Sequence, residues 1–215
     1  MKDNREYQIK LMSALAKVFP GQEPEEDPCC TGFTMLRGET FSFVAAYTCG
    51  GGNGGRGNFD AVVRVESPAA EYCRIREIIP VPSLRPVNSC ADSNYLRTQP
   101  GMYPDLLTEP AGGRITFTPG QFKSLWIDVE IPENGPHGEI PVAVVFASPE
   151  GEELCRRETS IQVYRTVLGP QRLLRTEWFH GDCLADYYQV PVFSEEHWRI
   201  MENFISAAAA RGCNM

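Results

Sequence analysis

Hydrophobic and polar residues alternate with a period of two in several short segments between about residue 6 and residue 168. The clearest segments are 41–47, 59–65, 125–131 and 140–146. Clusters of turn-forming residues separate them, at 37–39, 133–138 and 148–153. Strict alternation indicates strands with one buried and one wetter face. Several short strands at this spacing predict an antiparallel β-sandwich.

The alternation also predicts which side chains form the core. Four segments contribute to the buried faces: Phe41, Phe43, Ala45 and Tyr47; Phe59, Ala61, Val63 and Val65; Leu125, Ile127, Val129 and Ile131; and Ile140, Val142, Val144 and Phe146. In the third segment the pattern assigns the intervening residues to the wetter face: Ser124, Trp126, Asp128 and Glu130.

The period changes at about residue 170. The mostly apolar run 172–179 predicts a buried strand, and a long loop follows it. Ser194 is suited to cap a helix over 194–211, with a hydrophobic staple between Phe193 and Trp198. Gly212 fits the position after the helix, and 213–215 would begin another strand.

Strand, loop, helix and strand start form the first unit of a parallel α/β fold. We therefore expect a sandwich domain over 1–169 and the start of a TIM-like (β/α)8 barrel over 170–215. A complete barrel needs about 250 residues. The second domain is thus expected to be truncated, and the chain to be an N-terminal fragment of a longer protein.

Composition narrows the class of protein. The 215 residues are 42% hydrophobic, with 17 Pro and 19 Gly, which favours short strands and turns over long helices. A net charge of −8 argues against nucleic acid or an anionic membrane as the main partner. The first 20 residues lack the apolar core of a secretory signal, so we expect a cytoplasmic protein. The eight cysteines are then expected to be reduced, and without a C-x-x-C pair they do not indicate structural zinc.

Several stretches resemble a known family. TEWFHGDCLADYY and VFSEEHW, between 176 and 198, resemble the start of the catalytic barrel of glycoside hydrolase family 123. YLRTQPGMYPDLL (95–107) and SLWIDVEIPENGPHGEIPVAV (124–144) resemble the N-terminal β-sandwich of that family, as does the opening SALAKVFPGQEP. The family contains β-N-acetylgalactosaminidases.

The resemblance implies a retaining, substrate-assisted hydrolase of terminal N-acetylhexosamine that needs no cofactor. An adjacent Asp-Glu pair later in the barrel would orient the 2-acetamido group and supply the general acid. No Asp of this sequence is followed directly by Glu, so no catalytic residue can be assigned here. The substrate would be a carbohydrate bound mainly by the rest of the barrel, and self-association into a homo-oligomer stays open.

Five residues are candidates for binding substrate, because loops after barrel strands build the active-site face. They are Trp178, His180, Asp182, Asp186 and Tyr187. Polar groups there could bind sugar hydroxyls, and an aromatic ring could stack on the sugar. The alternative is that His180 and Asp182 only cap the strand end and order the loop. A metal site at His180, Cys183 and Asp186 is disfavoured, because no fourth ligand lies nearby in the sequence. A nucleophilic role for Cys183 is also disfavoured, because no base and orienting group can be identified for it.

Two features of the predicted sandwich have alternative interpretations. The Gly-rich segment 49–58 lacks the Lys and hydroxyl of a phosphate-binding loop, so a flexible hairpin loop is the better interpretation. Trp126 either covers the joint with the next domain, which we favour, or binds sugar.

A second hypothesis for the whole chain follows. The sandwich would be a carbohydrate-binding or protein-interaction module without catalytic activity.

Overall fold

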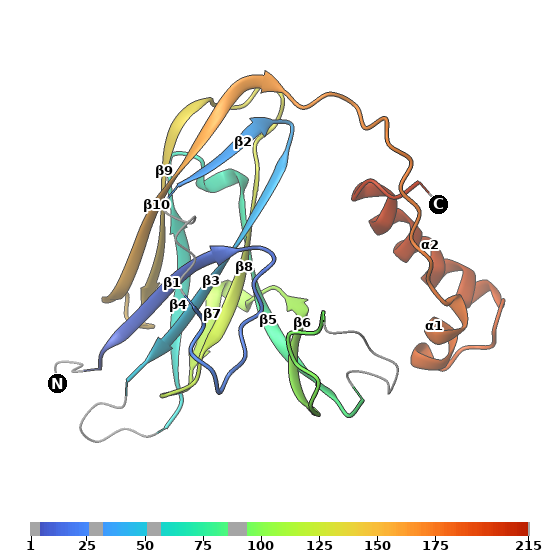
Figure 1. The fold of residues 1–215 in the computed structure, drawn as a ribbon, viewed down its shortest axis with the longest axis horizontal. Helices are drawn as coiled ribbons and strands as arrows, with labels where there is room; N and C mark the ends of the chain where they lie inside the picture. Colours follow the sequence, from blue (N-terminus) through green and yellow to red (C-terminus); the bar gives the residue numbers. More distant parts are fainter. Residues whose placement is uncertain (1–4, 26–31, 51–56, 86–93, 215) are drawn as a thin grey trace. The chain divides into compact units, whose positions relative to one another are not determined.

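The computed structural model describes residues 5–25, 32–50, 57–85 and 94–214. They form two compact units, 1–168 and 169–215. The first unit contains ten strands and two short 3-10 helices (Figure 1): β1 (Tyr7–Ser13), β2 (Phe33–Arg37), β3 (Thr40–Cys49), β4 (Phe59–Glu66), η1 (Ala70–Tyr72), β5 (Cys73–Ser83), β6 (Gly101–Thr108), η2 (Ala111–Gly113), β7 (Arg114–Phe117), β8 (Lys123–Glu130), β9 (Gly138–Ala147) and β10 (Glu153–Val167). The second unit contains α1 (Gly181–Tyr188) and α2 (Glu195–Ala210).

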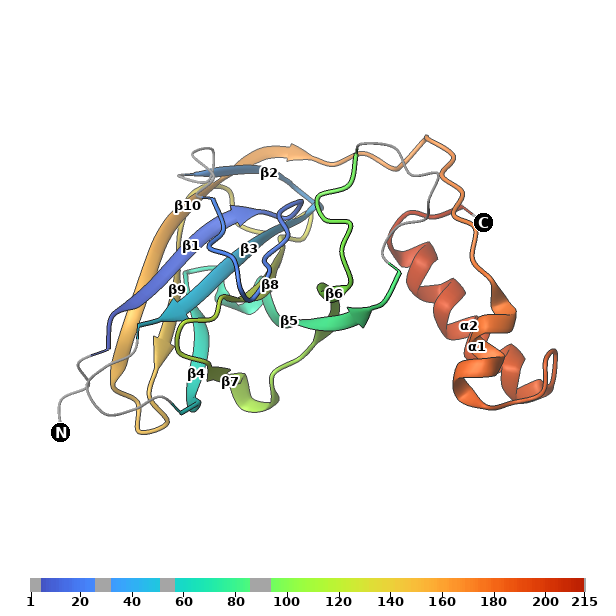
Figure 2. The same cartoon turned by 60° about the horizontal axis from the view of Figure 1, so that its bottom comes forward.

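The strands form two five-stranded sheets, which confirms a mainly β fold. The first has the order β1-β3-β8-β5-β6 and the second β2-β10-β9-β4-β7. Figure 2 shows β6 at the open edge of the first sheet, beside β5. One pair departs from the antiparallel prediction, because β2 runs parallel to β10. Alternation reveals which face of a strand is buried, but not the direction of its neighbour.

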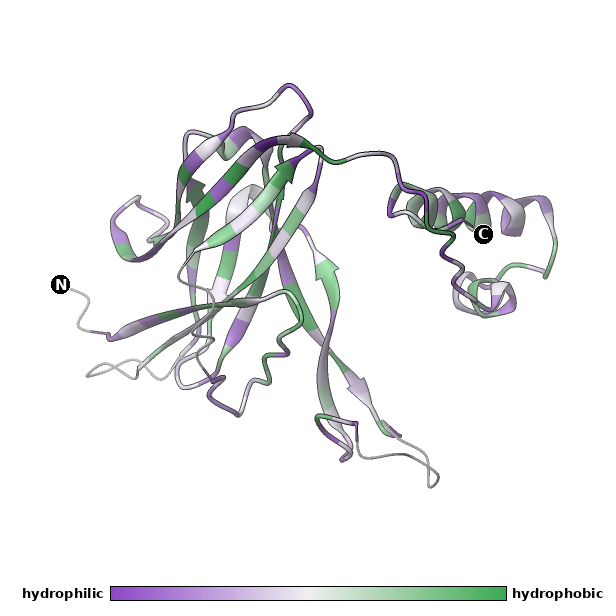
Figure 3. Cartoon of the chain, turned by 45° about the horizontal axis from the view of Figure 1, so that its top comes forward, coloured by the Kyte–Doolittle hydropathy of each residue, from purple (hydrophilic) through white to green (hydrophobic). Residues whose placement is uncertain are grey.

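The core lies between the two sheets and contains the side chains that alternation predicted. Phe43, Tyr47, Leu125, Val144 and Phe146 are all fully buried. The alternation of apolar and polar bands is visible along the strands in Figure 3. Burying one such side chain stabilises the fold by about 1.5–3 kcal/mol, so this shared layer is what holds the sheets together.

Phe117 of β7 lies at the centre of an aromatic cluster in this core. Its ring centroid is 5.0 Å from that of Tyr47, 5.2 Å from Phe59 and 5.4 Å from both Tyr7 and Phe146. The rings come from β1, β3, β4 and β9, and therefore from both sheets. Edge-to-face and stacked contacts of this kind add directional packing to the burial of apolar area.

The outer face of the first sheet corrects one prediction. Ser124 and Asp128 were expected on the wetter face, yet each is only 2% exposed. A second apolar cluster covers part of this face, formed by Met12, Val18, Val44, Ala46 and Phe122 with Ala16, Ile78 and Trp126 packed against it. The prediction fails because residues of the segment after β1 pack on this face, and because Asp128 pairs with Ser42 and Arg76 of the neighbouring strands. Alternation within β8 carries no information about either.

The Gly-rich segment between β3 and β4 corrects another prediction. β3 belongs to the first sheet and β4 to the second, so this connection is a crossover between sheets and not a hairpin. Residues 51–56 themselves lie outside the described part of the chain. Elsewhere a glycine is required by geometry: Gly113 has φ +72°, and a Cβ there would lie 2.7 Å from the carbonyl oxygen of Val63.

The second unit contains helices but no described strand. The predicted strand over 172–179 is therefore wrong, and part of the predicted long loop is the helix α1. A strand needs a neighbouring strand that completes its ladder of hydrogen bonds. Among the described residues of this unit, the backbone N–H of Asn214 makes one such bond to the segment, donating to the Arg175 carbonyl at 2.7 Å. The strands expected for the first unit of a barrel are therefore absent from the described part of 170–215.

Helix α2 agrees with the sequence prediction. The Ser194 side chain accepts a hydrogen bond from the backbone N–H of His197, as an N-cap should. The rings of Phe193 and Trp198 stack with centroids 5.8 Å apart, which is the expected staple. Gly212 follows the helix with φ +84°. None of the described helices is long and apolar enough to cross a membrane.

Candidate functional site

The five candidate substrate residues lie in or just before α1. Trp178 precedes the helix, His180 is its N-cap residue, and Asp182 lies in its first turn. Asp186 and Tyr187 follow one turn later. Because residues four apart share a helix face, the carboxylates of Asp182 and Asp186 project from the same side of α1.

These side chains are open to solvent. Trp178 is 97% exposed and Tyr187 80% exposed. His180 Nδ1 lies 3.9 Å from Asp182 Oδ1, and both side chains are largely exposed. The structure thus brings His180 and Asp182 together, and it packs the Tyr187 ring edge-on against Tyr188 at 5.0 Å. No described contact joins Trp178 to the other four.

The contacts of His180 and Asp182 indicate whether these two residues serve only to order the loop. The His180 side chain makes no capping hydrogen bond, so its imidazole does not stabilise the start of α1. Asp182, in the first turn, interacts favourably with the helix dipole and therefore has a local structural use. An exposed imidazole beside a carboxylate can donate to and accept from hydroxyl groups, as sugar binding requires. Within the described ranges, no three His, Cys, Asp or Glu side chains are grouped as a metal would require.

His197 is a polar residue of this unit that the sequence reasoning missed. It lies in the first turn of α2 and is 0% exposed. Its Nδ1 is 2.8 Å from the backbone nitrogen of Phe193, and its Nε2 is 2.7 Å from the carbonyl oxygen of Gly181. The available signal was its position three residues after Ser194, where a capping box places a side chain that reaches back to the backbone.

A second polar contact joins the two ends of the unit. The Gln171 amide nitrogen donates to the carbonyl oxygens of Leu173 and Gly212, at 2.9 Å and 2.8 Å. The backbone N–H of Arg175 donates to the side-chain oxygen of Asn214 at 3.0 Å. These bonds hold the segment before α1 beside the segment after α2.

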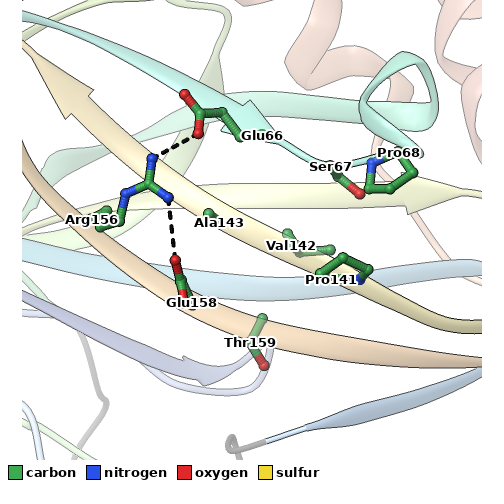
Figure 4. Close-up of a pocket in the computed structure, with 9 residues that line it drawn as sticks. All are labelled: Glu66, Ser67, Pro68, Pro141, Val142, Ala143, Arg156, Glu158 and Thr159. Atoms are coloured by element: carbon green, nitrogen blue, oxygen red, sulfur yellow. Dashed lines mark hydrogen bonds and ion pairs between the residues drawn. The ribbon is translucent and has the colours of Figure 1, made fainter.

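In the sandwich, a groove of about 370 Å³ crosses the outer face of β4, β9 and β10 (Figure 4). Arg156 lies at one end of it and hydrogen-bonds three carboxylates: Glu66 at 2.7 Å, Glu153 at 2.9 Å and Glu158 at 3.2 Å. Hydrogen bonds from Arg64 and Arg156 lower the pKa of Glu66, and the bond from Arg156 lowers the pKa of Glu153. The guanidinium is thus occupied on every nitrogen by the protein itself.

A cleft of about 560 Å³ lies elsewhere on the sandwich, beside β5 and β6. Its lining includes the aromatic side chains Phe19, Tyr95 and Tyr103 together with Arg97 and Asp105. The Arg97 guanidinium lies 4.9 Å from the centre of the Phe19 ring, and the Tyr103 hydroxyl donates to the Gln99 carbonyl at 2.6 Å. A lining of apolar and aromatic side chains with a few polar groups is typical of small-molecule sites.

Trp126 belongs to a buried polar cluster on the outer face of the first sheet. Its indole N–H donates to Asp128 Oδ1 at 2.6 Å, and the Ser42 hydroxyl donates to the same oxygen at 2.6 Å. Arg76 forms an ion pair with the other oxygen, Oδ2. The indole N–H is therefore used inside the sandwich, which leaves only the ring face of Trp126 for either of its predicted roles.

Comparison with known proteins gives a family match for the second unit only. Residues 178–215 match the family model described as Glycoside hydrolase 123, catalytic domain. This segment contains all five candidate substrate residues. A search of curated proteins gave no match.

Among solved structures, the chain is similar to a family 123 glycoside hydrolase from Clostridium perfringens, studied for glycolipid glycan hydrolysis. The TM-score is 0.70 at 12% identity, over 94% of this chain and 36% of that enzyme. The likeness establishes a common fold, and this chain spans about a third of the enzyme's length. A variant of the SrpA adhesin from Streptococcus sanguinis is much less similar, with a TM-score of 0.33 at 10% identity, over 82% of this chain and 69% of that one.

Proposed function

We propose that this chain is the N-terminal part of a glycoside hydrolase of the family 123 type. The observation that carries the proposal is the match of residues 178–215 to the catalytic-domain model, in a chain that also has the fold of a family 123 enzyme. In this proposal the sandwich supports a catalytic barrel, and 170–215 is the beginning of that barrel. The bond between Asn214 and Arg175 would be the first of a parallel strand pair.

The substrate we propose is a glycan ending in an N-acetylhexosamine, of the N-acetylgalactosamine type. Cleavage would be substrate-assisted: the acetamido oxygen attacks the anomeric carbon, and an Asp-Glu pair orients that group and protonates the leaving oxygen. This chain contains no such pair. Its contribution would be binding: His180, Asp182 and Asp186 offer groups for sugar hydroxyls, and Trp178 and Tyr187 offer exposed ring faces.

Substitution of Asp182 tests this binding role. In the full-length protein, Asp182→Asn should lower kcat/KM for an aryl N-acetylhexosaminide by about 10- to 100-fold, since the variant loses a charged hydrogen bond that is worth about 1.5–3 kcal/mol. The stability should change little, because the side chain is exposed. Glu202→Gln, an exposed change on α2, is the matched control and should leave kcat/KM unchanged. Equal kcat/KM in the wild type and Asp182→Asn would return Asp182 to a purely structural role.

The alternative function is a carbohydrate-binding sandwich without catalysis, and the cleft beside β6 is the observation that favours it. Tyr95 is 46% exposed there, and Asp105 lies on the same lining. If this alternative holds, the 215-residue chain binds N-acetylhexosamine oligosaccharides in calorimetry, and Tyr95→Ala abolishes the heat signal. Glycan binding that survives Tyr95→Ala, or no binding at all, excludes this cleft as a sugar site.

A further inference from the structure

We infer that His197 is a positioning residue that sets the turn carrying His180 and Asp182. The inference rests on the proposed function, because it assigns His197 a role at the substrate-binding surface proposed above. His197 does not reach that surface itself, since its ring is 0% exposed. It acts through the backbone of Gly181, the residue between His180 and Asp182.

The hydrogen bonds of His197 determine its tautomer. The backbone N–H of Phe193 can only donate, so Nδ1, at 2.8 Å, must accept through its lone pair. The proton of the neutral imidazole is then on Nε2, which donates to the Gly181 carbonyl at 2.7 Å. One ring therefore connects the entry of α2 to the entry of α1. Breaking the bond at Nδ1 deprives the Phe193 N–H of this acceptor, and breaking the bond at Nε2 leaves the buried ring N–H without its acceptor.

Packing around Gly181 makes this connection specific. A Cβ at Gly181 would lie 2.9 Å from the sulfur of Met201, so the start of α1 lies directly against this α2 side chain, which would have to move if residue 181 had a side chain. Met201 is 6% exposed and Ala185 only 1% exposed, which gives the two helices a small buried contact. That contact fixes the distance between the helices. The bond from His197 is the directional contact that fixes how the first turn of α1 is rotated.

The backbone before α2 is held in an unusual conformation by the same ring. Phe193 has φ +61°, in the left-handed region that bulky residues rarely adopt. Its N–H bond to His197 and its stacking on Trp198 together compensate for this conformation. A residue that holds a strained loop on one side and a helix start on the other fits a role in pre-organising a site.

Two substitutions separate the two bonds. In His197→Gln the terminal amide nitrogen can occupy the place of Nε2 and still donate to Gly181. In His197→Asn the side-chain oxygen can occupy the place of Nδ1 and accept from Phe193, but nothing reaches Gly181. Ser194→Ala is the matched control, because it removes the helix cap without touching either bond of the ring.

The kinetic experiment uses the full-length protein and an aryl N-acetylhexosaminide. His197→Asn should lower kcat/KM about tenfold or more, since a small misplacement of binding groups is costly. His197→Gln should recover most of this loss, and Ser194→Ala should leave kcat/KM unchanged while lowering the midpoint of urea unfolding. Equal kcat/KM in the Asn and Gln variants would overturn the inference.

A second readout uses the 215-residue chain and does not depend on activity. Long-range 1H–15N spectra should show Nδ1 of His197 unprotonated and Nε2 protonated. The amide shifts of 180–183 should move in His197→Asn and stay near the wild-type values in His197→Gln. If the full-length protein has no glycosidase activity but these shifts behave as stated, the proposed function fails and the positioning stands. A protonated Nδ1, or equal shift changes in both variants, contradicts the positioning itself.

Discussion

Replacing Asp128 by alanine should be among the most destabilising single changes in the sandwich. The carboxylate is 2% exposed and accepts hydrogen bonds from Ser42 and Trp126, each at 2.6 Å. It also pairs with Arg76, whose side chain is only 18% exposed and whose Nε has no partner within the described residues. Asp128→Ala therefore leaves a mostly buried guanidinium without its ion-pair partner.

The magnitude follows from that unpaired charge. Removing one partner of a buried ion pair costs about 3–5 kcal/mol. Because Arg76 keeps some contact with water, we expect a loss of about 3 kcal/mol in the free energy of unfolding, at the lower end of that range. Ser42→Ala removes one hydrogen bond to the same carboxylate and should cost about 1.5–3 kcal/mol. The double variant Arg76→Met with Asp128→Leu removes both charges but also the acceptor shared by Ser42 and Trp126, so its stability should lie between that of the wild type and that of Asp128→Ala.

Urea unfolding of the 215-residue chain, followed by circular dichroism of its strands, measures these free energies. Tryptophan fluorescence is less suitable, because Trp178 and Trp198 belong to the other unit. Strong coupling is the expected result: the double variant should be more stable than Asp128→Ala alone. The reasoning is refuted if Asp128→Ala lies within about 0.5 kcal/mol of the wild type, the usual range for a surface change.

Further expectations follow from the rest of the structure. Burial, together with the charge of Glu153, raises the pKa of the Cys155 thiol to about 12. At pH 8, iodoacetamide should therefore label the exposed Cys183 well before Cys155. Equal labelling rates, measured by peptide mass spectrometry, would contradict this. Gly113→Ala should lower the thermal midpoint by several degrees, because a Cβ there meets a carbonyl of β4 at a positive φ; an unchanged midpoint would show that the turn can relax. Amides of 196–208 should exchange faster than those of 124–131, because α2 exposes several large apolar side chains whereas β8 is central to a sheet; equal protection in a monomer would refute it.

The fold of the sandwich was largely predictable, and the failures share a cause. Alternation identified the buried faces of β3, β4, β8 and β9, because a half-buried strand must repeat every two residues. It missed the burial of Asp128, whose partners Ser42 and Arg76 lie on the neighbouring strands β3 and β5. The partner of β4 and the direction of β2 are likewise decided by contacts remote in sequence.

The second unit shows the same division between local and remote information. The cap at Ser194, the staple and Gly212 are local signals, and all three were predicted correctly. The strand expected over 172–179 depends on neighbouring strands, which the described residues do not supply. The place of His197 three residues after Ser194 was a local signal that we missed, but its bond to Gly181 could not be predicted, because that bond reaches a separate helix. The substrate role of His180 and Asp182 stays a prediction.

The most direct test of the proposed function is hydrolysis of a matched pair of aryl glycosides by the full-length protein of which we propose this chain is a part. The pair is an N-acetyl-β-galactosaminide and the corresponding β-galactoside, which differ only at the 2-position. We expect the first to be cleaved with retention of configuration and the second not at all, because only the first carries the acetamido group that attacks the anomeric carbon. The 215-residue chain alone should cleave neither. Equal cleavage of both substrates by the full-length protein, or of neither, would contradict the account.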